Sequence, residues 1–317
     1  MNVVYALLMI LCRAARFAPL ASASSAAAAA RMAIRFLCVL MVMTNLGAAD
    51  RILVHGHRGA RAVRPENTLP AFEYAIAAGV DVLELDLAVT RDNVLVVSHD
   101  PVMNLTYCSG PEGAKRTIRE MTFAELQQWD CGSKVNPEFP NQQPAPGARV
   151  PSLEQVLKLA ARGRFDFNIE TKIFKDRPQL TPSPEEFARL LAEALRKHSV
   201  VSRTIVQSFD YRTLHAMKKI LPEVRLAALY AGPPKSFVAI AREAGAGIVS
   251  PHHLLVTAEQ VEEAHAAGLQ VVPWTANTER DWERLIRAKV DAIITDDPAR
   301  LLAFLKQRVA ASKPPAP

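Results

Sequence analysis

Short runs of apolar and often β-branched residues alternate with longer amphipathic segments from Arg51 onward. This alternation is typical of repeated strand–helix units around a parallel sheet. Eight such units predict an α/β fold, the (β/α)8 TIM barrel. The predicted strands are Ile52–His57, Val82–Val89, Phe165–Lys172, Thr204–Phe209, Leu226–Tyr230, Gly247–Pro251, Leu269–Thr275 and Ala292–Thr295.

The segments between these strands carry helix start and stop signals. Side-chain oxygens followed three residues later by Glu or Gln can satisfy the free backbone donors at a helix start. A glycine just past a helical segment suits the left-handed conformation that ends many helices, as at Gly79, Gly245 and Gly268. The predicted starts are Thr122-x-x-Glu125, Ser152-x-x-Gln155, Ser183-x-x-Glu186 and Thr257-x-x-Gln260.

One segment interrupts the alternation between the second and third strands. Residues 101–151 are rich in Pro, Gly, Asn and Gln, with one short helical pattern near Thr122–Trp129. Because ordinary strand–helix connections are much shorter, we expect a functional insertion over the mouth of the barrel. The barrel domain is expected to span residues 50–311, followed by a disordered tail at 312–317.

The N-terminal residues are predicted to be a leader. The segment from Met32 has an Arg, an apolar run and a Gly-Ala-Ala end, as in a signal peptide cleaved before Asp50. An uncleaved anchor is the alternative, but the run is shorter than the roughly 20 residues of a membrane span. Residues 1–49 are thus a leader, with Met32 the expected true start, and we expect an exported protein, periplasmic or secreted.

Composition and charge exclude several other classes of protein. The chain has 317 residues, is 50% hydrophobic and 22% charged, and carries a formal charge of +6. Four arginines and no acidic residue precede Asp50, which leaves +2 on the rest of the chain. A nearly neutral body does not favour a nucleic-acid partner. No stable membrane span is expected after cleavage, and no pattern indicates an oligomeric state.

After cleavage the chain would keep two cysteines, Cys108 and Cys131, both in the insertion. An even pair in an oxidising compartment is compatible with a disulfide. Two unrelated thiols are the alternative, because the sequence does not give the separation of the Cα atoms.

Carboxylates stand at positions where a barrel strand faces inward. Since side chains alternate along a strand, Glu84 and Asp86 share one face of the second strand, and Asn168, Glu170 and Lys172 share one face of the third. Buried carboxylates so close together need a cation or hydrogen-bonding partners. Glu84, Asp86 and Glu170 therefore predict a site for one hard divalent cation, Ca²⁺ or Mg²⁺. A purely structural ion-pair cluster with Arg58 and Lys172 is the alternative.

Two histidines and two cations complete a candidate phosphoryl-transfer site. His57 and His99 end apolar runs and can supply an acid and a base near neutral pH. Arg58 and Lys172 place positive charge where an anion could bind. A metal, cations, a base and an acid are the groups that phosphoryl transfer needs. His55 taken alone is expected to be structural.

An ordered series of motifs runs from Arg51 to about Leu302: His57-Arg58-Gly59, Pro65-Glu66-Asn67-Thr68, Glu84-x-Asp86, Thr90-Arg91-Asp92, His99-Asp100, Asn168-Ile169-Glu170-x-Lys172, Trp274-Thr275-x-Asn277 and Thr295-Asp296. This series resembles the glycerophosphodiester phosphodiesterase family.

The resemblance implies a TIM barrel that hydrolyses small-molecule glycerophosphodiesters to glycerol 3-phosphate and an alcohol. A divalent metal would be held by Glu84, Asp86 and Glu170, and His57 and His99 would be the acid–base pair. In the family's proposed mechanism the free glycerol hydroxyl attacks phosphorus and gives a cyclic phosphate that water then opens. Arg58 and Lys172 would bind the phosphate, and Trp274 would line the glycerol or alcohol side.

Three other functions compete with this one. A zinc amidohydrolase would begin its metal site with His55-x-His57 but would need Lys or His on the fourth strand and His on the fifth, and the predicted strands Thr204–Phe209 and Leu226–Tyr230 have neither. A noncatalytic phosphate-ligand-binding barrel would not need the full set of catalytic groups. A lysophospholipase D would use the same site on single-chain lipids. Whether Phe123, Trp129 and Phe139 of the insertion form an apolar groove would discriminate this last alternative.

Overall fold

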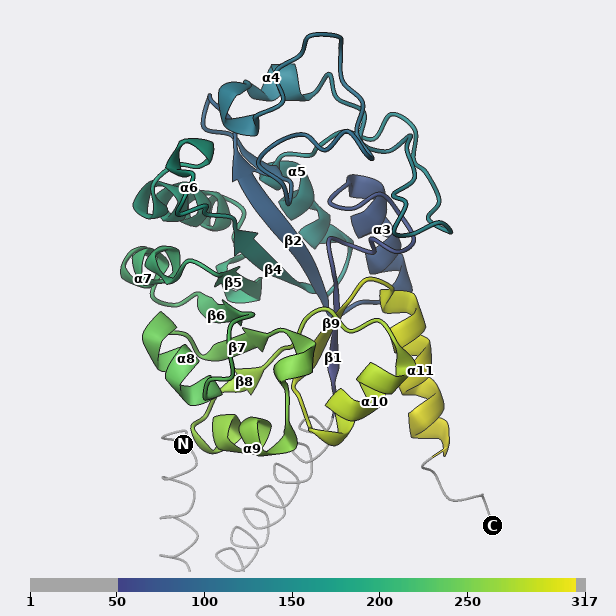
Figure 1. Ribbon diagram of the computed structural model, residues 1–317, viewed down its shortest axis with the longest axis vertical. Helices are drawn as coiled ribbons and strands as arrows, with labels where there is room; N and C mark the ends of the chain where they lie inside the picture. Colours follow the sequence, from purple (N-terminus) through teal and green to yellow (C-terminus); the bar gives the residue numbers. More distant parts are fainter. Residues whose placement is uncertain (1–50, 312–317) are drawn as a thin grey trace, which may run out of the picture. The chain divides into compact units, whose positions relative to one another are not determined.

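Eight parallel strands close into a barrel in the computed structural model, which describes residues 51–311 (Figure 1). The order around the barrel is β8-β7-β6-β5-β4-β2-β1-β9. Backbone bonds from Asp291 to Val271 and from Ile294 to Pro273, both 3.0 Å, join the last two strands and complete the circle. The strands are β1 (Leu53–Gly56), β2 (Val82–Val89), β4 (Asp166–Thr171), β5 (Thr204–Ser208), β6 (Arg225–Tyr230), β7 (Ile248–Pro251), β8 (Gln270–Val271) and β9 (Ala292–Thr295).

Helices follow the strands and surround the barrel (Figure 1). The predicted capping boxes form at Thr122 and Ser152, and the glycines at 79, 245 and 268 adopt left-handed backbone angles. The prediction of a (β/α)8 barrel is therefore confirmed. The helices are α3 (Leu69–Ala78), α4 (Phe123–Leu126), α5 (Leu153–Leu157), α6 (Pro184–Lys197), α7 (Tyr211–Ile220), α8 (Phe237–Ala244), α9 (Ala258–Ala266), α10 (Glu279–Arg287) and α11 (Pro298–Ala311).

Two details of the sheet differ from the prediction. The expected strand at Leu269–Thr275 is regular only over Gln270–Val271, because Pro273 has no N–H to donate to a neighbouring strand. A short strand that was not counted, β3 (Leu95–Val97), pairs antiparallel with β2 outside the barrel. It carries the chain from the end of β2 into the insertion.

The apolar residues form three clusters that support this architecture. A large cluster lies between the strands and the helices, and includes fully buried Phe72, Phe187 and Trp282. A small cluster that includes Ile205 and Ile248 gathers inward-facing residues of the barrel strands. The third belongs to the insertion. Burial of apolar surface at about 25 cal/mol per Å² is the main term that holds such layers together.

The insertion, residues 101–151, has its own core and is fixed to the loop that follows β1. Trp129 is 2% exposed within its apolar cluster, and Cys108 and Cys131 are joined by a disulfide. The Gln142 side chain donates to the carbonyls of Arg61 and Arg64, at 2.6 and 3.0 Å. The insertion therefore braces the first strand–helix loop of the barrel.

The predicted leader, 1–49, and the predicted tail, 312–317, lie outside the described residues. Within residues 51–311, helices that combine the length and the apolar character needed to cross a membrane are absent.

Candidate active site

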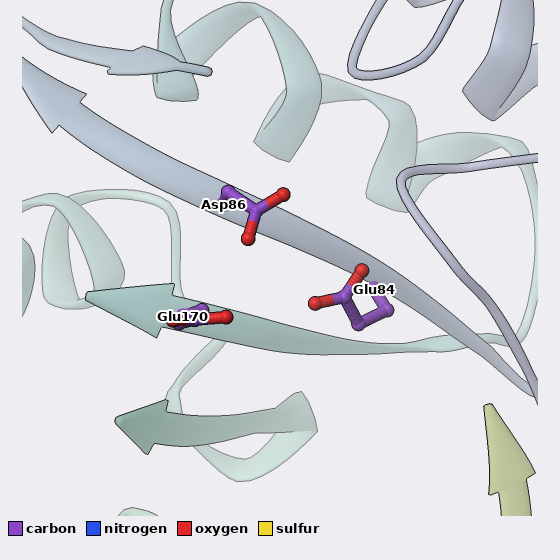
Figure 2. Close-up of side chains that lie close together, drawn as sticks. All are labelled: Glu84, Asp86 and Glu170. Carbon is purple, nitrogen blue, oxygen red and sulfur yellow. The ribbon is translucent and has the colours of Figure 1, made fainter. Parts of the chain in front are cut away.

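Three carboxylates meet inside the barrel on neighbouring strands. Glu84 and Asp86 project from β2 and Glu170 from β4, as Figure 2 shows. Asp86 and Glu170 are direct partners in the parallel ladder. One oxygen of each carboxylate lies within 4.8 Å of the other two, and the three residues are 2%, 1% and 6% exposed. The structure thus brings together the three predicted metal ligands.

Burial and mutual repulsion perturb these acids. Burial and the neighbouring Asp86 raise the pKa of Glu84 well above its usual value. Burial, together with Asp86, raises the pKa of Glu170 to about 7, although Lys172 opposes the shift. For Asp86 burial acts in the same direction, but Lys172 and Arg58 outweigh it and lower the pKa. Ionising all three acids is therefore costly without further positive charge.

Two predicted phosphate-binding cations lie against the carboxylates. Lys172 Nζ is 2.9 Å from Glu170 Oε1 and 3.4 Å from Asp86 Oδ1. Arg58 Nε is 3.3 Å from Asp86 Oδ2, and its Nη1 is 2.7 Å from Glu66 Oε1. Burial opposes the charged form of Lys172, but the pKa of its amine is raised because Asp86 and Glu170 favour the cation. Both cations are 11% exposed, so each retains some access to solvent or a ligand.

The charges of the site fit one divalent cation. Among the described residues, the site holds a group of charged side chains that are each at most 15% exposed and are linked by ion pairs or through His57. This group consists of five carboxylates and three cations. The ion pairs alone thus leave two negative charges uncompensated when all the acids are ionised. Hard oxygen donors grouped in this way are the ligands that Mg²⁺ and Ca²⁺ prefer. The carboxylates are Glu66, Glu84, Asp86, Glu170 and Asp296, and the cations are Arg58, Arg61 and Lys172.

The loop after β1 presents backbone groups as well as side chains. The Arg58 N–H donates to Glu84 Oε2 at 2.9 Å, and Arg58 has a φ of 49°, in the left-handed region. An added Cβ at Gly59, with φ +84°, would lie 2.8 Å from the Ala71 backbone, so only glycine fits there. Strained backbone of this kind is often kept at functional sites. Here it turns the Arg58 amide toward Glu84.

Two amide side chains hold the carboxylates: sequence reasoning left Gln207 out of the site and gave Asn67 no separate role. Gln207 donates to Glu84 Oε1 at 2.8 Å, and Asn67 donates to Asp86 Oδ2 at 2.9 Å. Asn168 does not join the three carboxylates, although it shares their face. It donates to Gln207 Oε1 at 2.9 Å instead. Gln207 lies one residue before the end of β5, and that position near the mouth of the barrel was the one available signal for its role.

His57 lies between Asp296 and Glu84, which is one of the three predicted metal ligands. Its Nδ1 is 2.5 Å from Asp296 Oδ1, and its Nε2 is 4.0 Å from Glu84 Oε2. Burial lowers the pKa of His57 and outweighs the opposing effect of Asp296. The imidazole is therefore suited to act in its neutral form, as a proton acceptor.

His99 has a similar partner in a more open position. Its Nδ1 is 2.8 Å from Asp100 Oδ1, and its side chain is 33% exposed. The hydrogen bond from His99 is the main cause that lowers the pKa of Asp100. The Tyr107 hydroxyl of the insertion is 3.4 Å from both Asp100 Oδ2 and Glu66 Oε1. Tyr107 thus connects the partner of His99 with the partner of Arg58.

Trp274 lies just after β8, in the interrupted seventh strand of the barrel. Its Nε1 donates to the Ser250 carbonyl at 2.8 Å, and its ring packs edge-on against Phe209 and His252. Phe209 is 46% exposed. The predicted contact of Trp274 with substrate remains a prediction.

His55 lies deeper in the barrel and outside the carboxylate group. It is 1% exposed, and burial lowers its pKa to about 3. Its Nδ1 is 3.5 Å from the Asn168 amide. His55 is thus a buried, neutral histidine of the barrel interior. Among the described residues, His55 and His57 do not belong to a group of side chains that could hold a zinc ion.

Oxygen ligands and cations at the ends of barrel strands place the protein among the TIM-barrel enzymes that act on phosphate esters. Residues 57–300 match the glycerophosphoryl diester phosphodiesterase family. The chain belongs to this family and is a phosphodiesterase.

Individual relatives agree with this assignment over most of the chain. A glycerophosphodiester phosphodiesterase from Caldanaerobacter subterraneus is 33% identical over 81% of this chain and 99% of its own. A solved protein from Silicibacter pomeroyi, provisionally named a glycerophosphoryl diester phosphodiesterase, is 32% identical, with a TM-score of 0.77 over 82% of this chain and 94% of its own. An Oleispira antarctica phosphodiesterase, solved with the product sn-glycerol-3-phosphate, shares the fold at 24% identity, with a TM-score of 0.68 over 80% of this chain and 96% of its own.

Proposed function

We propose that this protein hydrolyses glycerophosphodiesters to sn-glycerol 3-phosphate and an alcohol, with one Ca²⁺ or Mg²⁺ ion and the histidines His57 and His99. The observation that carries the proposal is the meeting of Glu84, Asp86 and Glu170 within 4.8 Å, beside two cations that are each 11% exposed. Homologous phosphodiesterases named for this substrate class support it, as does the relative solved with the product.

Each group has a role that follows from its surroundings. Glu84, Asp86 and Glu170 would hold the ion, which when bound supplies positive charge to the phosphate oxygens. Arg58 would contact the phosphate with its remaining donors, since its guanidinium is oriented by Asp86 and Glu66. Lys172 would share its ammonium between Glu170 and the substrate.

The two histidines divide the proton transfers between them. His57 is the more buried and has a lowered pKa, so its free Nε2 would take the proton of the attacking hydroxyl. His99 is more exposed and paired with Asp100, so its imidazolium would donate a proton to the oxygen of the departing alcohol as the phosphorus–oxygen bond breaks. The two histidines would then exchange roles as water completes the hydrolysis. His99 would take a proton from the attacking water, and His57 would return its proton to the hydroxyl oxygen that is released from phosphorus.

The insertion favours a small alcohol over a long acyl chain. Trp129 is buried in the insertion core, and Phe123 packs against that core. Phe139 lies under the Arg61 guanidinium, 4.8 Å from ring centre to Cζ. Trp129 and Phe139 are thus engaged in packing, and the cavity that Phe123 borders with Leu95 and Leu190 does not include the three site carboxylates in its lining. A groove for a lysophospholipid tail at the site is therefore not formed by these three aromatic side chains. Single-chain lipids are therefore the second candidate substrate.

Export to the periplasm or the medium belongs to the same proposal. Disulfides persist chiefly in oxidising compartments, and the structure joins Cys108 to Cys131. An exported enzyme would meet glycerophosphodiesters outside the cytoplasm.

The test is release of glycerol 3-phosphate from glycerophosphocholine by the purified protein, before and after EDTA treatment, with Mg²⁺ or Ca²⁺ added back. We expect release that EDTA abolishes and one of the two ions restores. Release from lysophosphatidylcholine alone would move the assignment to the single-chain substrates. No release from either substrate by folded, metal-loaded protein would favour a noncatalytic phosphate-ligand-binding barrel.

A further inference from the structure

Asp296, which is buried, and Asn277, which is exposed, form a hydrogen-bonded pair next to His57 at the seam where the barrel closes. Asp296 follows β9, whose residue Thr295 accepts a backbone hydrogen bond from the His57 N–H at 2.9 Å. Asp296 is 4% exposed. One carboxylate oxygen, Oδ1, is 2.5 Å from His57 Nδ1, and the other, Oδ2, accepts from Asn277 Nδ2 at 2.7 Å.

Asn277 holds Asp296 from two sides. While its Nδ2 donates to the carboxylate, its Oδ1 accepts from the Asp296 backbone N–H at 2.9 Å and from the Thr295 hydroxyl at 3.2 Å. Three contacts thus fix the direction of the Asn277 amide. The carboxylate of Asp296 cannot rotate away from His57 without losing the bond from Asn277.

We propose that Asp296, oriented by Asn277, is a positioning residue that holds His57 with its proton on Nδ1 and its Nε2 free to face the reaction site. An ionised carboxylate only accepts hydrogen bonds, so the imidazole nitrogen that contacts it carries the proton. Burial would raise the pKa of Asp296, but His57, Arg61 and Asn277 outweigh burial and lower it, which keeps the carboxylate ionised. The inference rests on the proposed role of His57 as the base.

Replacement of Asp296 by Asn provides a sharp test because Asn277 would control the new amide. The Asn277 Nδ2 donor selects the carbonyl oxygen of the introduced amide, which turns the new NH2 group toward His57 Nδ1. The imidazole then has to accept at Nδ1 and carry its proton on Nε2. The Asp296→Asn variant therefore preserves the shape of the site but reverses the tautomer of His57.

The first measurement is the nitrogen NMR spectrum of the His57 ring, identified by its loss in His57→Gln. We expect the proton on Nδ1 in the wild-type protein and on Nε2 in Asp296→Asn. In the kinetic assay kcat should fall roughly 10³-fold with KM within about twofold, as for loss of a proton acceptor. Asp166→Asn, at the opposite end of a barrel strand, is the matched control and should keep the wild-type spectrum and rate.

A second substitution separates positioning from general damage. Asn277→Ala in the Asp296→Asn background removes the donor that orients the introduced amide, which can then turn its oxygen to His57. We expect this double variant to regain Nδ1 protonation and at least tenfold in kcat over Asp296→Asn alone. Absence of both recoveries would overturn the role of Asn277. If Asp296→Asn does not fold, Asn277→Ala alone should lower kcat about tenfold at unchanged KM, and an unchanged kcat would overturn the proposal.

Other outcomes have equally definite meanings. Nδ1 protonation in folded Asp296→Asn, or an inverted tautomer with the wild-type rate, would overturn the assignment of Asp296. A wild-type protein that releases no glycerol 3-phosphate would instead refute the proposed function. The ring spectrum would still report the bond between Asp296 and His57 in that case, so the two failures are distinguishable.

Discussion

Removal of the disulfide between Cys108 and Cys131 should loosen the insertion while the barrel stays folded. The bridged cysteines are 23 positions apart, and closing a loop of that length in the unfolded state corresponds to about 3 kcal/mol of stabilisation. The half-cystines are 3% and 6% exposed, so Ala at both positions avoids burying new hydroxyl groups. We expect Cys108→Ala/Cys131→Ala to lose most of this stabilisation in the insertion.

Hydrogen exchange measures this loss where it occurs. The Ser109 N–H donates to the Asp130 carbonyl at 2.7 Å, and the Asp130 N–H donates to the Ser109 carbonyl at 2.8 Å. The protection of these two amides should fall roughly 10²-fold, which corresponds to about 3 kcal/mol. Amides of the barrel strand β5 are the internal control and should change by less than about threefold. Wild-type protein treated with a reductant should reproduce the double variant. Insertion amides that keep their protection in the double variant would refute the calculation.

The remaining predictions concern the site and the insertion. Glu84→Ala should abolish turnover and weaken Mg²⁺ or Ca²⁺ binding while circular dichroism stays unchanged, and near-wild-type activity would contradict the metal assignment. His99→Ala should slow the reaction most for alcohols that are poor leaving groups, and an equal loss across leaving groups would argue against an acid role. Tyr107→Phe should lower kcat severalfold, whereas Tyr211→Phe, which removes a hydroxyl distant in sequence that bonds the Leu229 carbonyl, should leave kcat unchanged. Burial acts to raise the pKa of Asp130, but hydrogen bonds donated by Gly132, Ser133 and Gly147 lower it to about 2. The contribution of Asp130 to stability is therefore complete above about pH 4 and is lost as the pH falls toward 2. Asp130→Asn should remove this pH dependence from the thermal unfolding of the insertion.

The regular part of the fold follows from local sequence signals. The strand bounds at Val82–Val89 and Ala292–Thr295 match the prediction, because apolar β-branched runs bounded by polar or glycine residues define a buried parallel strand. The strand expected at Leu269–Thr275 was predicted too long. There the apolar pattern continues through Pro273, but proline cannot donate to the ladder.

The site could be predicted only in part, for a similar physical reason. Alternation along a strand placed Glu84, Asp86 and Glu170 on inward faces, and the structure brings them together. The same rule placed Asn168 with them, but it contacts Gln207. Alternation gives the face of a side chain and not its hydrogen-bond partner. The pairing of His57 with Asp296 joins the first and last strands, and a contact of that range leaves no local pattern.

The bond between His57 and Asp296 spans 239 positions of the chain, so it forms only once β9 lies beside β1. The carboxylates of β2 and β4 need only the early part of the barrel to meet, so the means to bind an ion can arise before the ring is closed. The orientation of His57 by Asp296 cannot arise before the ring is closed. On the proposed function, hydrolysis would therefore begin only after β9 has docked on β1, and a chain clipped before Asp296 would keep the three carboxylates without the oriented histidine.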